Sequence, residues 1–559
     1  MALSVPIEGK PEPIVETEMP KDQHPNSLSS TILENLPRIL PDFLPRQRWF
    51  GGKARTIKAA TILETIKIPF GDQIAYVVLS RINYTEGNDE TYAIPFMREG
   101  PQGEGAAIAS ADSKSSLKLE TQGAKTVLYD AFLDNDFSRA LFESIRDGKS
   151  YQGTAGELVG RPTSMFRDAK EGIESVSEPH LMKGEQSNTS VRYGERSILK
   201  FFRRLEQGMN PDVEIGTFLT EKASFGHSPA VCGILEYRHP QMQTCALGIL
   251  QDFVLNQGDA WRYTLSVLND YLVGAPPKEA GSEPLVRKIP LSESRNLIIP
   301  DDVPGEIGDY WESAGLLGRR TGELHVALAS DSADPDFRPE QFSADFQRSQ
   351  YDSMRGLANQ VLRVLEKRFA TLDVSIREDA RRVLDREKEM LGRFEAFANH
   401  KLTANCIRIH GDYHLGQVLY TGSDFVIIDF EGEPARPLAE RRKKRCALQD
   451  VAGMLRSFHY AAYTAHYSQE SNTEPQLPGR NKSLLWTQYW LWWVSVQFLQ
   501  KYLSAAANSQ FLPSSQDEFA ILLDAYLLEK AIYELGYELN NRPDWVRLPV
   551  QGILELLQS

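Results

Sequence analysis

Three side chains that could carry out phosphoryl transfer lie within one short stretch of the chain. Asp412 and Gln417 are five residues apart in HGDYHLGQ, and Asp429 follows the apolar run FVII. In kinase chemistry one aspartate takes the proton of the acceptor hydroxyl, while an amide side chain and a second aspartate hold metal ions against the nucleotide phosphates. The spacing therefore predicts that Asp412 is the base and that Gln417 and Asp429 are metal ligands. A hydrophobic strand with an acidic end would explain Asp429 alone, but not the three together.

The same stretch contains two residues that we expect around the bound acceptor, His410 and Glu431. A histidine just before Gly-Asp more often organises its loop by hydrogen bonding than performs chemistry, so a structural role is predicted for His410 at this place. Farther on, Asp450 opens DVAGMLRSFHYAAY. We predict that it is a helix N-cap, with the further option of a hydrogen bond back to the catalytic loop.

A second group of side chains could hold the nucleotide phosphates. Lys200 lies in the apolar strand ILKFF, from which a lysine can reach phosphate as a compact positive charge. Its expected partner is Glu214, because Asn210 and Pro211 are typical of a helix start and place Glu214 in the first turn. The alternative is that Lys200 is solvated and that Glu214 only complements the helix dipole.

The polar loop before this strand and a later apolar strand would complete the nucleotide site. The loop lacks a GxGxxG motif, so its phosphate donors would be backbone amides and hydroxyls. The candidate loop residues are Ser187, Asn188, Thr189 and Ser190. The run ALGILQDFVL ends in a polar break, as expected of a hinge between lobes, although a plain buried strand would look the same. Backbone groups of Gln251, Phe253 and Val254 would contact the adenine edge.

Composition limits the classes of function. The 559 residues are too many for one compact core, and 41% hydrophobic residues are enough for several. A net charge of −14 disfavours nonspecific binding to nucleic acid or to an anionic membrane. The four cysteines are widely spaced, unlike a zinc site, and no apolar run has the length of a membrane span. We therefore expect a cytoplasmic protein that acts on a small molecule.

Periodicity divides the chain into parts. Residues 1–30 are expected to form a disordered tail. Apolar stretches at 59–68, 75–84 and 91–97 are separated by turn residues, which predicts an antiparallel sheet within a subdomain spanning 31–150. The segment 99–123 is expected to be a loop. A second β-rich unit is predicted at 151–256 and a mostly helical unit at 257–559.

The chain resembles the maltokinase family in a series of motifs that occur in order. The motifs are LPRQRWFGGKAR, GRRTGELHVAL, HGDYHLGQ with DFEGEPARPLAERR, DVAGMLRSFHYAA and LEKAIYELGYELNNRPDW. Members of this family make maltose 1-phosphate from maltose and ATP. The resemblance implies an α+β, bilobal protein-kinase-like fold with an N-terminal cap at 31–150, a nucleotide-binding N-lobe at 151–256 and a helical C-lobe. It also implies ATP and Mg²⁺ as cofactors and a role in glycogen and α-glucan synthesis from trehalose.

Three residues near the C-terminus suit a sugar on physical grounds as well. Lys530, Tyr533 and Tyr537 have the spacing i, i+3, i+7, so they share one face of a predicted helix. They offer a charged donor and two aromatic surfaces to a disaccharide. An amphipathic core helix with tyrosines at its edge would produce the same pattern.

Two other functions remain open at this stage. One is a related kinase that acts on glucosamine or another hexose, and the other is a noncatalytic kinase-like partner of trehalose synthase. No length is left for an amylase-type barrel, so such a synthase would be a separate partner. The basic run Arg441–Arg445 lies between Glu440 and Asp450, and we predict a solvated loop rather than a nucleic-acid patch.

Overall fold

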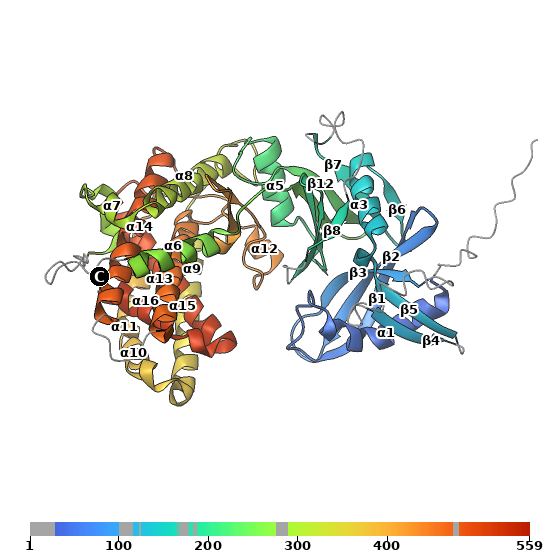
Figure 1. The fold of residues 1–559 in the computed structure, drawn as a ribbon, viewed down its shortest axis with the longest axis horizontal. Helices are drawn as coiled ribbons and strands as arrows, with labels where there is room; N and C mark the ends of the chain where they lie inside the picture. Colours follow the sequence, from blue (N-terminus) through green and yellow to red (C-terminus); the bar gives the residue numbers. More distant parts are fainter. Residues whose placement is uncertain are drawn as a thin grey trace, which may run out of the picture.

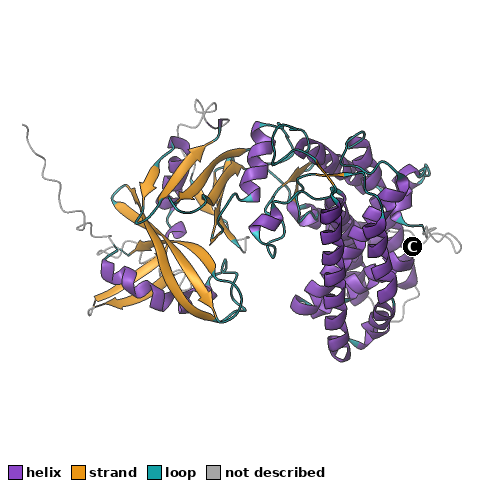
Figure 2. Ribbon diagram, turned by 180° about the vertical axis from the view of Figure 1, so that it is seen from behind, coloured by secondary structure: helices purple, strands orange, loops and turns teal. Residues whose placement is uncertain are grey.

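The structure is a computed structural model that describes residues 28–99, 116–121, 124–164, 166, 178–182, 187–274, 289–472 and 480–558. Most of its strands lie in one half of the molecule and most of its helices in the other (Figures 1 and 2). The chain enters the helical half between strand β13 (Cys245–Asp252) and helix α6 (Ala260–Gly274). None of the helices within the described ranges is long and apolar enough to cross a membrane.

The first sheet comes from the N-terminal part of the chain and has the order β1-β2-β3-β5-β4, with β11 paired to β3. Its strands are β1 (Ile57–Phe70), β2 (Gln73–Tyr84), β3 (Glu90–Arg98), β4 (Ser116–Thr121), β5 (Ala124–Asp130) and β11 (Arg204–Leu205). Strand β2 is buried on both faces. Tyr76 and Val78 pack in a core with helix α1 (Ser30–Phe43), whereas Val77 and Leu79 face the second sheet. Successive side chains of β2 thus point into two different cores, which explains why this stretch is a continuous apolar run.

The second sheet has the order β6-β7-β12-β13-β10-β9-β8. Its strands are β6 (Ser150–Gln152), β7 (Glu157–Pro162), β8 (Pro179–Leu181), β9 (Asn188–Tyr193), β10 (Ser197–Phe202), β12 (Val231–Arg238) and β13. Strands β8, β9 and β10 are antiparallel neighbours. Gly194 turns between β9 and β10 with φ 59°, a value that glycine adopts at little cost. Lys200 lies in β10, directly opposite Ser190 of β9.

One apolar core joins the two sheets. Ile66 and Leu79 from the first sheet share it with Leu158 and Leu199 from the second, and helix α3 (Asn135–Asp147) contributes Phe137 and Leu141. One face of the cap sheet therefore packs with α1 in a core of its own, and the other face shares this core with the second sheet. The cap sheet packs against the N-lobe as the two layers of a single domain would.

Two buried charges complete this junction. Glu64 in β1 accepts hydrogen bonds from the Thr154, Ala155 and Gly156 backbone N–H groups at 2.6, 3.0 and 2.6 Å, and from the Tyr237 hydroxyl at 3.0 Å. Burial by itself raises the pKa of Glu64, but the hydrogen bonds from Thr154 and its neighbours outweigh burial and lower it.

Arg203, which follows β10, is the second of these charges. Its guanidinium donates to Asp130 at 2.6 Å and to the Thr189 hydroxyl at 2.8 Å, and it lies 4.7 Å from the Trp49 ring centroid. Trp49 belongs to the RQRWFGG segment, so this motif contacts the strand region that carries Lys200.

Helices build the second half of the molecule. They are α6, α7 (Val303–Ile307), α8 (Tyr310–Leu328), α9 (Ala344–Arg368), α10 (Val374–Asp385), α11 (Glu387–Asn399), α12 (Leu438–Arg441), α13 (Leu448–Asn472), α14 (Arg480–Ala505), α15 (Gln516–Asn541) and α16 (Arg547–Gln558). Gly318 lets α8 approach α14 closely, because a Cβ there would lie 2.1 Å from the Phe498 carbonyl oxygen. This explains the first glycine of GRRTGELHVAL.

Two local predictions were wrong. The expected loop 99–123 contains a strand, because Ser116–Thr121 form β4 and pair with β5; residues 100–115 lie outside the described residues. The run Arg441–Arg445 is not a solvated loop. The side chain of Arg441 is 3% exposed and pairs with Glu206, and Lys444 pairs with Glu340 at 2.5 Å. Acidic residues distant in the sequence neutralise the run.

Candidate active site

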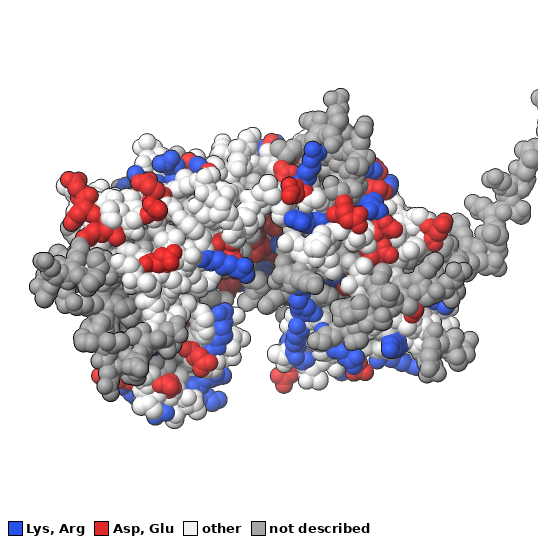
Figure 3. Space-filling model, in the orientation of Figure 1, with Lys and Arg blue, Asp and Glu red and all other residues white. Residues whose placement is uncertain are grey.

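A cleft separates the two halves, and acidic and basic side chains gather at its inner end (Figure 3). On the helical side, a pocket is lined by Asp412, Lys530 and Tyr533. Lys530 Nζ lies 3.8 Å from Asp412 Oδ1. The structure therefore brings the predicted base and two of the three predicted sugar residues together, although they are more than a hundred positions apart in the chain.

The buried carboxylate of Asp450 accepts hydrogen bonds from the loop that carries Asp412. The backbone N–H groups of His410 and Gly411 donate to the Asp450 carboxylate at 2.7 and 2.9 Å. His325 Nε2 lies 3.1 Å from the same carboxylate. Burial raises the pKa of Asp450, but the hydrogen bond from His325 and the backbone donors outweigh it and lower the pKa. The predicted bond back to the loop is present, but the N-cap prediction was wrong, because α13 begins at Leu448 and Asp450 lies within its first turn.

His410 is buried beneath the loop, and its Nε2 lies 2.9 Å from the Ile428 carbonyl oxygen. It does not line the pocket described above, so its place among the substrate-binding residues was wrong. The ring instead joins the Asp412 loop to the strand before Asp429. The loop-organising role fits this position.

A short hairpin brings Gln417 beside Asp429. Strands β16 (Val418–Tyr420) and β17 (Phe425–Ile427) pair between them, and the Ile428 N–H donates to the Gln417 carbonyl oxygen at 3.0 Å. The Gln417 side chain hydrogen-bonds to the Asp429 carboxylate. Asp429 has φ 67°, a strained backbone conformation of the kind that clusters at functional sites.

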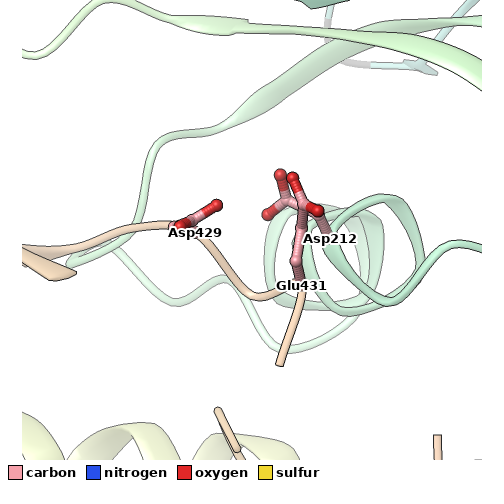
Figure 4. A group of neighbouring side chains, drawn as sticks. All are labelled: Asp212, Asp429 and Glu431. Atoms are coloured by element: carbon pink, nitrogen blue, oxygen red, sulfur yellow. The ribbon is translucent and has the colours of Figure 1, made fainter. Parts of the chain in front are cut away.

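Asp429, Asp212 and Glu431 form a carboxylate cluster, with ligand atoms within 4.8 Å of one another (Figure 4). Lys200 binds all three. Its Nζ lies 3.2 Å from Asp212 and 2.6 Å from Glu431, and it also contacts Asp429. The Asn188 amide donates to Glu431 at 2.9 Å. Glu431 therefore lies on the Lys200 side of the site, and its role as a sugar ligand stays a prediction.

Charge in this cluster favours a cation. Burial raises the pKa of Asp212 even beside Lys200, whereas for Asp429 the charge of Lys200 outweighs burial and lowers the pKa. One ammonium faces three carboxylates, and carboxylate and amide oxygens are the ligands that Mg²⁺ prefers. The donor set fits a magnesium ion held by Asp429 and Gln417 with Asp212 and Glu431 beside it.

Glu214 does not lie where it was predicted. Lys200 pairs with Asp212, two residues earlier in helix α5 (Pro211–Glu221), while Glu214 binds Arg408 and Arg442. Two positions along a helix turn a side chain by about 200°, so only one of the two acids can face Lys200. The sequence PDVE shows that two acidic residues lie in the first turn of this helix. It does not show which of them faces Lys200, because that depends on the rotation of the helix about its axis.

The residues predicted to bind phosphate do not all lie on the same face of strand β9. Asn188 and Ser190 oppose Phe202 and Lys200 in the β9–β10 register, so they share the face of Lys200. Thr189 lies on the other face, and its hydroxyl accepts a hydrogen bond from Arg203. The prediction for Thr189 was therefore wrong. Ser187 is exposed just before β9, and residues 183–186 lie outside the described residues.

The hinge prediction can be compared with the backbone hydrogen bonds. Gln251 lies within β13 opposite Ile198, and the Phe253 N–H donates to the Arg196 carbonyl oxygen at 2.7 Å. The Val254 carbonyl accepts from the Asn256 side chain at 2.8 Å. The Phe253 N–H is therefore already used by the sheet and is not a donor for adenine.

The pocket contains acidic and basic residues that the sequence analysis missed. Glu433, Arg436 and Glu529 line it together with Asp412 and Lys530. Arg436 donates to Glu433 at 2.5 Å. Burial raises the pKa of Glu529, against the opposing charge of Arg436. These residues could have been predicted from the sequence, because they lie close to Asp429 or Lys530 in the chain. Tyr537, by contrast, is 42% exposed and is not part of this pocket lining.

Comparison with known proteins agrees with this architecture. Residues 43–134 match the maltokinase N-terminal cap domain. The resemblance to maltokinases inferred from the motifs is confirmed by this match. The chain thus carries a maltokinase-type cap on its N-lobe.

Two curated relatives are glucosamine kinases. The protein from Mycolicibacterium smegmatis is 24% identical over 282 residues, which cover 50% of this chain and 58% of the relative. The protein from Streptacidiphilus jiangxiensis is 23% identical over 245 residues, which cover 44% and 49%. The matches span about half the length of these relatives.

Solved structures show the same fold. A glucosamine kinase in complex with glucosamine, ADP and inorganic phosphate has a TM-score of 0.59 at 16% identity, with 89% of this chain and 93% of that chain covered. A second crystal form of a glucosamine kinase has a TM-score of 0.60 at 16% identity, with 94% and 100% covered. The predicted α+β, bilobal kinase-like fold is confirmed.

Proposed function

We propose that the protein is an ATP- and Mg²⁺-dependent kinase that converts maltose to maltose 1-phosphate. The observation that carries the proposal is one cleft with two chemical sides. Lys200, Asp429 and Gln417 form its phosphate side, and Asp412 lies with Lys530 and Tyr533 on its acceptor side. The maltokinase-type cap at 43–134 favours maltose as the acceptor.

Each residue then has a defined task. Asp412 accepts the proton of the anomeric hydroxyl as oxygen attacks the γ-phosphoryl group, and base assistance of this kind contributes about 10²- to 10⁴-fold. Lys530 donates hydrogen bonds to sugar hydroxyls, and Tyr533 offers a ring to an apolar sugar face. Lys200 binds the nucleotide phosphates. A bound Mg²⁺, held by Asp429 and Gln417, supplies charge neutralisation for the transferring phosphoryl group.

Glucosamine is the second candidate acceptor. The curated relatives and the solved structures above are glucosamine kinases. The acidic pocket residues Glu433 and Glu529 favour this alternative, because a carboxylate can bind the ammonium group of an amino sugar. The related hypothesis of a noncatalytic partner of trehalose synthase predicts no turnover of any sugar.

A sugar panel separates these possibilities. The purified chain is incubated with ATP, Mg²⁺ and maltose, glucose, glucosamine or trehalose, and ADP formation is measured while NMR identifies the phosphorylated carbon. We expect the highest kcat/KM for maltose and phosphate on C1. A higher value for glucosamine would replace maltose as the acceptor.

Two variants connect the result to the site. Asp412→Asn should lower kcat, because the variant lacks the base that accepts the proton of the sugar hydroxyl. Tyr533→Ala should raise the KM for maltose and leave the KM for ATP within about twofold, because we assign Tyr533 to the acceptor side only. Equal and negligible turnover of wild type and Asp412→Asn on every sugar would support the binding-partner hypothesis. Pull-down of a separate trehalose synthase by the purified chain would then be the next measurement.

A further inference from the structure

Helix α5 belongs to both halves of the molecule. Val213 packs with Ile249 and other residues of the N-lobe sheet, whereas Ile215, Phe218 and Leu219 lie in the core of the helical half. The ring of Phe218 stacks on Phe337 with 3.6 Å between centroids and 6° between planes. The helix is therefore packed against the C-lobe, although in sequence it follows the strand of Lys200.

Glu214 attaches the first turn of this helix to the C-lobe. Its carboxylate is 9% exposed and lies 2.8 Å from Arg408 Nη2, and Arg408 is 2% exposed. Arg442 approaches the same carboxylate with Nε at 3.0 Å and Nη2 at 2.6 Å. Arg408 precedes the catalytic loop and Arg442 follows helix α12, so both arginines come from the C-lobe.

Asp212 projects from the opposite side of the same turn. It binds Lys200 of the N-lobe at 3.2 Å and accepts a hydrogen bond from the Phe430 N–H at 2.9 Å. Phe430 lies between Asp429 and Glu431. The position of α5 therefore determines where Asp212 meets Lys200 and the metal-binding segment.

We propose that Glu214, Arg408 and Arg442 are positioning residues for the nucleotide site. Their ion pairs hold α5 on the C-lobe and thereby set the geometry of Asp212, Lys200 and the Asp429 segment. This inference rests on the proposed ATP-dependent function. A charged group is well suited to this task, because a buried ion pair adds little net stability but is strongly orientation-dependent.

The chain contains a matched control. Glu236 is 12% exposed and is also held by two arginines, with Arg161 Nη2 at 3.1 Å and Arg238 Nη2 at 2.8 Å. All three lie in or beside strands β7 and β12 of the N-lobe, away from the α5 contacts described above. Glu236→Gln therefore removes the same kind of interaction without releasing α5.

The test is direct titration of Mg·ADP onto the full chain by calorimetry, together with separate KM values for ATP and sugar. Glu214→Gln should weaken Mg·ADP binding about tenfold, a change of about 1.4 kcal/mol, and should raise the KM for ATP similarly while leaving the KM for sugar within about twofold. Glu236→Gln should leave nucleotide affinity within about twofold of wild type.

A second variant covers the case in which Glu214→Gln does not fold. Arg442→Ala removes a partner that is 32% exposed and leaves Arg408 on Glu214, so it should weaken Mg·ADP binding about threefold. Unchanged nucleotide affinity in folded Glu214→Gln or Arg442→Ala, or an equal loss in Glu236→Gln, would overturn the proposal. Binding of Mg·ADP needs no sugar, so this experiment can be interpreted even if maltose is not the acceptor. A wild-type protein that binds no nucleotide would contradict both the proposed kinase function and the positioning role.

Discussion

The two boundaries within the molecule are built in different ways. The cap meets the N-lobe through an apolar core that includes Ile66 and Leu199, and buried charges such as Glu64 and Arg203 bind partners across that boundary. The N-lobe meets the C-lobe through apolar residues of α5, such as Phe218, but around the cleft it does so through charged groups, among them Lys200 with Asp429 and Glu206 with Arg441.

The difference follows from what each boundary must do. An apolar core excludes water and opens only at the cost of exposing its surface, so the cap and the N-lobe behave as one body. A charged boundary can exchange its partners with water, phosphate or a cation. We infer that the lobe boundary serves ligand exchange, whereas the cap boundary maintains the shape of the strands around Lys200.

The largest effect should come from the charged boundary and should affect activity alone. Asp412→Asn should lower kcat by about 10²- to 10⁴-fold, and Asp429→Asn by at least as much, because metal binding and phosphate positioning depend on that carboxylate. Circular dichroism and thermal unfolding should show both variants folded. Greater residual activity in Asp429→Asn than in Asp412→Asn contradicts the metal assignment.

Substitutions at the boundary between the cap and the N-lobe should instead lower the stability of the fold. Arg203→Met leaves Asp130 buried without its guanidinium, and removing one partner of a buried pair costs about 3–5 kcal/mol. Urea unfolding measures the change. Arg161→Met is the control, since that side chain is 42% exposed and should shift stability by less than about 1 kcal/mol. Similar losses of stability in both variants would show that the buried pair at the cap boundary contributes no more than an exposed one.

A smaller and pH-dependent loss is expected for Glu64→Gln. The amide cannot accept all the hydrogen bonds that the carboxylate accepts, so about 1–3 kcal/mol should be lost at pH 7. The pKa of Glu64 is lowered in the folded state. Its contribution is therefore complete above the ordinary value of 4.5 and disappears as the pH falls through the lowered pKa. The stability difference between variant and wild type should shrink accordingly below about pH 4.5; a difference that stays constant with pH argues against this assignment.

The smallest effect should come from an ion pair at the charged boundary. Glu206 is 28% exposed, and Arg441 keeps its hydrogen bonds to the Arg436 and Glu431 carbonyl oxygens, so Glu206→Gln should change the free energy of unfolding by less than about 1 kcal/mol. The comparison with Glu64→Gln at equal salt concentration is informative, because both remove one carboxylate. A larger loss at Glu206 would show that the lobe boundary is as rigid as the cap boundary.

Predictions from the sequence succeeded where neighbours in the chain are neighbours in space. Asp412, Gln417 and Asp429 lie in one loop and hairpin, and the apolar run from Tyr76 to Leu79 is a strand with two buried faces. Predictions failed where a side chain's direction depends on a distant contact. Thr189 bonds to Arg203 because of strand pairing, and Phe253 donates to Arg196 for the same reason.

The sequence by itself determined which side chains are available for the proposed chemistry, since the types and spacing of the acidic residues, of Lys200 and of the Lys530 face are local facts. Only the tertiary structure decided the partners. Asp212 rather than Glu214 meets Lys200, and Glu214 meets Arg408, because packing of α5 against two cores sets its rotation about its own axis. Local sequence cannot specify that rotation, because acids two positions apart on a helix are equivalent until a neighbouring surface distinguishes them.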